Sequence, residues 1–115
     1  MRSFAAFVMA SSICCAAIAD EARDAYQQAY TSVQGALALQ LKCEESVRQG
    51  DMAPCKKAEK AYDEFKAKSS KFLASVKPEE LFQHVTPEEM SGLTQANTQI
   101  GESMDRTTAY LSRKK

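Results

Sequence analysis

Apolar and small residues recur every three or four positions along much of the chain, which is the spacing of one face of an α-helix. The first series runs through residues 20–49, and the polar Gln40 fills the single gap in it. Its other members are Ala22, Tyr26, Ala29, Val33, Ala36, Cys43 and Val47. The region therefore predicts one long helix with a narrow apolar face.

A second, more regular series follows Gly50 and Asp51, which break the first helix. It steps by three and four throughout and consists of Cys55, Ala58, Tyr62, Phe65, Ser69, Phe72 and Val76. Pro54 suits the first turn of the helix that this series predicts. Because the connection is short, we expect the two helices to form an antiparallel helical hairpin.

Cys43 and Cys55 are expected to form a disulfide across this hairpin. Eleven residues separate them, which excludes the C-x-x-C redox spacing. Two cysteines with the single His84 are also too few for a structural zinc site. Free thiols, or a catalytic or metal-binding role, are the weaker alternatives.

The disulfide and the apolar faces select the same alignment of the two helices. Placing the two cysteines opposite each other also sets Val33 beside Phe65 and Tyr26 beside Phe72. Large residues then meet small ones along most of the hairpin, which permits close packing.

Two Pro-Glu-Glu sequences follow the hairpin, and each is typical of a helix start. The first predicts a short helical turn near residues 78–83, and the second predicts a third long helix from Pro87 to about Ser112. Thr86 and Glu89 fit a capping box at its start. The apolar series of this helix is Met90, Leu93, Asn97, Ile100, Met104, Thr107 or Thr108, and Leu111.

The third helix is the weakest of the three, because Gly92 and Gly101 lie within it and Asn97 and Thr107 bring polar atoms near its apolar series. Either it packs loosely on the hairpin, or a partner completes its apolar stripe. The expected fold is all-α: a disulfide-linked antiparallel hairpin plus a third helix, forming a small three-helix bundle.

Residues 1–19 have the pattern of a secretory signal peptide. One basic residue, Arg2, precedes an uncharged apolar run of 15 residues, and Ala17-Ile18-Ala19 ends it just before Asp20. Removal after Ala19 leaves residues 20–115 as a single helical domain in a secreted or periplasmic location. The run is shorter than the roughly 20 residues that a spanning helix needs, so no integral membrane span is expected.

Lipidation at Cys14 or Cys15 is a weaker alternative to simple cleavage. The residues before them, Ser11-Ser12-Ile13, do not fit a lipobox.

Charge argues against general nucleic-acid binding. Without residues 1–19 the chain carries 14 Lys+Arg against 15 Asp+Glu. The charge is segregated, because residues 56–77 hold seven lysines and three acids, whereas residues 78–105 hold six acids and no lysine or arginine. The basic second helix either binds an anionic partner or, as we favour, lies between acidic neighbours.

No enzyme motif, cofactor motif or set of metal ligands is present in the sequence. We therefore expect a non-enzymatic protein that binds another exported protein or has a structural role, with self-association as a further option. The alternative is a carrier of a small apolar or metal-containing ligand, lined by Tyr26, Tyr62, Phe65, Phe72, Met90 and Met104. The candidate partner-binding residues are Asn97, Gln99, Met104 and Thr108 in the third helix and Lys56, Lys60 and Lys71 in the second.

Overall fold

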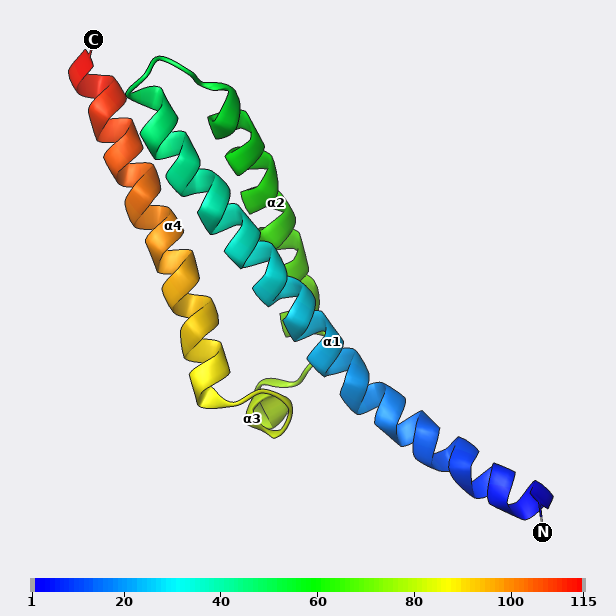
Figure 1. Ribbon diagram of the computed structural model, residues 1–115. Helices are drawn as coiled ribbons and strands as arrows, with labels where there is room; N and C mark the ends of the chain where they lie inside the picture. Colours follow the sequence, from blue (N-terminus) through cyan, green and yellow to red (C-terminus); the bar gives the residue numbers. More distant parts are fainter. Residues whose placement is uncertain (1, 115) are drawn as a thin grey trace.

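The fold is all-helical throughout the described part of the chain. The computed structural model describes the backbone of residues 2–114 and the side chains of residues 21–113. It contains four α-helices, α1 (Arg2–Val47), α2 (Ala53–Ala74), α3 (Leu81–His84) and α4 (Pro87–Lys114), with a 3-10 turn at Pro78–Glu80 before α3 (Figure 1). The expected helical turn after the hairpin is thus confirmed, as the 3-10 turn and the single-turn α3.

The helices α2 and α4 lie on either side of α1, and both pack mainly against it (Figure 1). The chain runs up α1, down α2 and up α4, so α2 is antiparallel to the other two. The expected architecture is therefore met in part, because the all-α class and the hairpin are present but the number of α-helices is four.

The hairpin has the predicted alignment. Cys43 and Cys55 form a disulfide with their Cα atoms 4.5 Å apart, and Tyr26 packs edge-on against Phe72 with ring centroids 5.8 Å apart. All eight residues of the predicted α1 series, Gln40 included, are buried. Ala58, Phe65 and Phe72 are the buried residues of α2.

A glycine ends α1 and lets the chain reverse. Gly50 has a φ of 82°, the left-handed region that favours glycine. Its N–H binds the Val47 carbonyl at 3.1 Å, and the Asp51 N–H binds the Ser46 carbonyl at 3.0 Å, which together make a Schellman motif. The Asp51 carboxylate then accepts a hydrogen bond from the Ala53 N–H at the start of α2.

The buried face of α4 differs from the predicted one at two positions. Ala96 is buried in place of Asn97, which is exposed, and Ser103 is buried beside the partly buried Met104. Thr107 rather than Thr108 belongs to the buried face. Both series step by three and four and share Leu93, Ile100 and Thr107, so the difference is a small rotation of α4. This rotation turns Ser103 and Thr107 toward Gln40 of α1, which donates hydrogen bonds to both.

One cluster joins the three long helices. Ala29, Val33 and Ala36 of α1 pack with Phe65 of α2 and with Leu93, Ala96 and Ile100 of α4. A second cluster at the α3 end contains Tyr26, Phe72 and Val85. A third surrounds the disulfide and includes Val47, Ala58 and the partly buried Leu111. The core thus runs from α3 to the disulfide, and α1 contributes to every part of it.

The backbone of residues 2–19, the expected signal peptide, continues α1 as helix, while Met1 and the side chains of this segment lie outside the described residues. No helix in the searched part of the chain is long and apolar enough to cross a membrane.

Candidate functional site

The side of α1 that faces away from α2 and α4 carries no charge over more than four turns. Between Asp24 and Lys42 the helix contains no charged residue. Six residues of this stretch form what we call the outer face of α1, and all are exposed: Gln27, Gln28, Thr31, Gln34, Gly35 and Ala38. Exposed helix surfaces normally carry charges, so this stretch is unusual in a chain with 26% charged residues.

Gly35 lies in the middle of the outer face, and nothing inside the molecule requires a glycine there. A Cβ atom added to it would meet no other atom within 4 Å. Glycine in a helix interior costs about 1 kcal/mol relative to alanine. The fold therefore gains nothing from Gly35, and the surface above it is open.

We expect Gly35→Ala to raise the free energy of unfolding by about 0.5 to 1 kcal/mol, because alanine restricts the unfolded chain and fits the helix without a clash. Urea denaturation followed by circular dichroism measures the change. Ala38→Gly, one turn along the same face, is the matched reverse substitution and should lower stability by a similar amount. The measurement is made on dilute protein, so that contacts between molecules do not contribute. A loss of stability in Gly35→Ala under these conditions would show that the chain itself fills the space.

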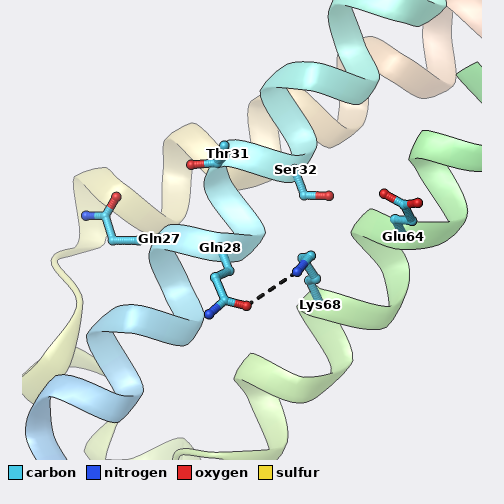
Figure 2. A pocket seen from close by; sticks show the side chains of 6 residues that line it. All are labelled: Gln27, Gln28, Thr31, Ser32, Glu64 and Lys68. Carbon is cyan, nitrogen blue, oxygen red and sulfur yellow. Dashed lines mark hydrogen bonds between the residues drawn. The ribbon is translucent and has the colours of Figure 1, made fainter.

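A polar groove borders the outer face on the side of α2. Its volume is about 410 Å³, and it is lined by Gln27, Gln28, Thr31 and Ser32 from α1 and by Glu64 and Lys68 from α2. Figure 2 shows Gln28 and Ser32 of α1 pointing toward Glu64 and Lys68 of α2, while Gln27 and Thr31 point away from α2. The Lys68 ammonium donates a hydrogen bond to the Gln28 side-chain oxygen at 3.4 Å. The groove offers amides and hydroxyls together with one charge of each sign.

Two further hollows border α1 on the side of α4. One, of about 360 Å³, is lined by Tyr26, Gln27, Tyr30, Glu88, Glu89 and Gly92. The other, of about 300 Å³, is lined by Leu37, Leu41, Gln99, Glu102 and Arg106. Leu41 is 47% exposed there. All three of these hollows thus lie beside the outward side of α1, and Gln27 lines one on each side.

Polar contacts hold α4 against α1, next to the outer face. The buried Gln40 amide donates to the hydroxyls of Ser103 at 3.3 Å and Thr107 at 3.4 Å. Glu44 accepts from the Ser103 hydroxyl at 2.7 Å and from Arg106 at 2.8 and 3.0 Å. Because Gln40 and Glu44 satisfy them, the polar atoms on the buried side of α4 do not need a partner protein.

The hydrogen bonds from Arg106 and Ser103 lower the pKa of the Glu44 carboxyl. The carboxylate therefore stays charged, and the contact between α1 and α4 is a charge-assisted one.

A second ion pair joins α1 to the start of α4. Arg23 donates to the Glu89 carboxylate at 2.7 Å and to the His84 carbonyl at 3.1 Å. Glu89 also accepts from the Thr86 N–H at 2.9 Å, while the Thr86 hydroxyl accepts from the Glu89 N–H, so the predicted capping box is present. The Arg23 and Thr86 hydrogen bonds lower the pKa of Glu89 to about 2.

This ion pair predicts an acid-sensitive fold. Glu89 loses its proton more readily in the folded chain than in the unfolded one, so the unfolded chain binds more protons between pH 4.5 and 2. The stabilisation is full above about pH 4.5 and is lost as the pH falls to about 2.

Glu89→Gln keeps the cap but removes the charge, and should therefore be less stable than the wild type at pH 7 and equal to it near pH 2. Urea midpoints measured across this range check the prediction. Glu79→Gln, which removes an exposed carboxylate from the other Pro-Glu-Glu sequence, is the control and should retain the wild-type dependence. Parallel curves for Glu89→Gln and the wild type would contradict the assignment.

The predicted partner-binding residues of α4 fall on two different sides of the helix. Asn97, Met104 and Thr108 are spaced by seven and four residues and share one side. Asn97 lies toward α2, where its side-chain oxygen accepts a hydrogen bond from the Tyr62 hydroxyl at 3.4 Å, and Met104 packs against the core. Gln99 lies on the α1 side, in the hollow with Leu37 and Leu41.

The predicted lysines of α2 are all exposed, namely Lys56, Lys60 and Lys71. Lys60 precedes Glu64 by one turn and therefore lies on the flank of α2 that borders the polar groove.

The residues proposed for a carrier are part of the packed core. Tyr26, Phe65 and Phe72 are buried, and Tyr62, Met90 and Met104 pack against them or their neighbours. Of these six side chains, Tyr26 alone lines any of the three hollows described above. A ligand between these residues would require the helices to separate.

Reasoning from the sequence missed the outer face of α1, although the signal is visible there as an uncharged stretch with a glycine at its centre. Within residues 21–113, the structure brings no three His, Cys, Asp or Glu side chains into a group that could hold a metal ion. Comparison of the chain with protein-family models, curated proteins and solved structures finds no significant match.

Proposed function

We propose that this protein is a small exported, non-enzymatic interaction module whose partner protein docks on the outer face of α1. The observation that carries the proposal is the exposed, uncharged surface from Gln27 to Ala38, with a hollow on each side of it. On this proposal residues 1–19 are a signal peptide that is removed after Ala19. Residues 20–115 then form one domain, a small three-helix bundle built on α1, α2 and α4.

An uncharged surface suits protein binding because the centre of an interface is depleted of charged residues. Glutamine amides can exchange water for hydrogen bonds to a partner without the large cost of removing a charge from water. Gly35 and Ala38 let a partner backbone come close to α1, while the flanking hollows can receive its larger side chains. A helix laid along α1 fits this shape.

The core of the protein supports a role as a rigid platform. The disulfide closes the turn between α1 and α2, and two arginine–glutamate pairs hold α4 at positions 23–89 and 44–106. Such a surface needs little ordering when it binds, which favours affinity. The disulfide is also compatible with a secreted or periplasmic location.

Of the four α4 residues predicted from the sequence to bind a partner, only one lies beside the outer face of α1. Gln99 borders the hollow beside Leu41 and would touch a partner on the outer face. Asn97, Met104 and Thr108 lie toward α2 and would form a second, separate surface.

A single added charge tests the proposal. Ala38→Arg puts a guanidinium into the uncharged face. Ser70→Arg puts the same group on an exposed position of α2 one turn after Lys66, on the flank where Tyr62 bonds Asn97 of α4 and away from the polar groove. Both variants should have the wild-type circular dichroism spectrum and, in dilute protein where self-association does not contribute, the wild-type thermal midpoint.

We expect chemical crosslinking in intact cells to give one crosslinked species for the wild type and for Ser70→Arg, and at least ten times less of it for Ala38→Arg. Equal amounts in all three would remove the outer face from the binding surface. Native mass spectrometry of the same preparations tests the carrier alternative, since a stoichiometric bound small molecule would count against the interaction module.

A further inference from the structure

We infer that the partner on the outer face of α1 is a second copy of this chain, packed in parallel about a two-fold axis that runs along α1. This inference rests on the proposed function and adds the identity and direction of the partner. It follows from the arrangement of charge on the two helices that flank the outer face.

The direction of pairing decides which helices meet. In each copy α2 and α4 lie on opposite sides of α1 (Figure 1). When two outer faces meet about an axis parallel to α1, α2 of each copy lies opposite α4 of the other. When the axis is perpendicular to α1, α2 lies opposite α2 and α4 opposite α4.

The two flanks carry opposite charge. The flank of α2 beside the polar groove holds Glu64 and Lys68, and helical spacing places Lys57, Lys60 and Lys71 on the same side. The flank of α4 beside the outer face holds Glu88, Glu102 and Arg106. Since Arg106 is already paired with Glu44, the free charge on this flank is acidic.

The α2 lysines and the α4 glutamates also lie at matching positions along the axis of α1. Glu88 lines the hollow at Tyr26 and Tyr30, and the residues of α2 at this height are Phe72, which packs on Tyr26, and Lys68, which binds Gln28. In the parallel pair, Lys68 and Lys71 of one copy therefore lie level with Glu88 of the other.

The second match lies nearer the disulfide. Glu102 lines the hollow at Leu37 and Leu41. The disulfide between Cys43 and Cys55 sets residues 57–61 of α2 at this height, so Lys57 and Lys60 of one copy lie level with Glu102 of the other. The perpendicular axis would instead oppose lysine to lysine, which is unfavourable.

The residues on the axis permit close approach. A parallel pair brings each residue of this side of α1 near its own counterpart, and Thr31, Gly35 and Ala38 are small. Asp24 and Lys42, which end the uncharged stretch, would also face their own counterparts, so the close contact is confined to the residues between them. Glutamines at 27 and 34 can form amide hydrogen bonds to each other, and they need no opposite charge to do so.

Sedimentation equilibrium of the protein, in the form recovered from the cell, tests the inference with three charge variants. Lys60→Glu and Glu102→Lys should each weaken self-association about ten-fold, because each change acts twice in a two-fold pair. Lys66→Glu is the matched control and should associate as the wild type does. Lys66 lies over the Tyr62 ring at 5.1 Å, on the flank of α2 toward α4 of its own chain.

Mixing the two weakened variants gives the decisive result. Lys60→Glu with Glu102→Lys should restore wild-type affinity as a mixed pair, because both α2–α4 contacts then join opposite charges. Lys60→Glu mixed with the wild type should not exceed wild-type affinity.

A mixture of Lys60→Glu with the wild type that binds more tightly than the wild type alone would indicate the antiparallel arrangement and overturn the inference. A protein that stays monomeric at all concentrations, yet loses a crosslinked partner in Ala38→Arg, would refute the second copy and leave the proposed function standing. A monomer with unaltered crosslinking in Ala38→Arg would refute both.

Discussion

Phe72→Ala should lower the free energy of unfolding by about 3 to 5 kcal/mol, the usual cost of removing a buried phenyl ring. Phe72 is fully buried, and its ring packs against Tyr26 of α1. Phe72 also joins α2 to Val85, just beyond α3, so the cavity opens where three segments meet. Small domains have total stabilities of about 5 to 15 kcal/mol, and this variant is expected to be partly unfolded at 37 °C.

Leu73→Ala is the matched control for this prediction. Leu73 is the next residue along α2 but is 54% exposed, so its truncation should change stability by less than about 0.5 kcal/mol. Urea denaturation of both variants measures the difference. Similar losses for the two variants would mean that α2 is rotated from the orientation described here.

Removing the disulfide should have the second largest effect. The bridge joins residues that are 12 apart in sequence, and in the chain-entropy account closing a loop of this size stabilises the folded state by about 3 kcal/mol. Replacing Cys43 and Cys55 together by alanine should therefore lower the free energy of unfolding by about that amount. The helical circular dichroism spectrum should remain at low temperature.

Reduction of the wild-type protein provides an independent check. The wild type in reducing agent should unfold at nearly the same urea concentration as the double alanine variant, and the variant itself should not respond to the reducing agent. A loss smaller than about 1 kcal/mol would show that the turn at Gly50 and the surrounding core hold the hairpin without the bridge.

The hairpin could be predicted from the sequence because two independent signals agreed. The spacing of apolar residues fixed which sides of α1 and α2 face each other, and Cys43 and Cys55 fixed their alignment along the axis. The helix end at Gly50 and the capping box at Thr86 and Glu89 could be predicted for a different reason. Each depends only on residues that are close together in the sequence.

The packing of α4 could not be predicted as well. Ser103 and Thr107 are buried in α4 because the Gln40 amide of α1 donates hydrogen bonds to their hydroxyls. Gln40 is more than 60 residues away in sequence, so this contact leaves no periodic pattern within α4 itself. Asn97 was predicted to lie on the buried side of α4, but the buried residue is its neighbour Ala96. The polar residues that suggested a missing partner are satisfied within the chain.

The candidate site was hidden from sequence reasoning for a related reason. An uncharged run such as residues 25–41 is compatible with complete burial, and only the positions of α2 and α4 show that one side of it remains exposed. The same arrangement separates Gln99 from Asn97, which lie close in sequence but border different surfaces.

The central claim is that the outer face of α1 is the binding surface. Site-specific photocrosslinking in living cells tests it most directly, with a photoreactive amino acid placed in turn at Thr31, Ala38 and Ser70. The account predicts crosslinks from positions 31 and 38 and none from position 70. Crosslinks from position 70 alone would place the partner on the side of α2 away from the outer face and contradict the account.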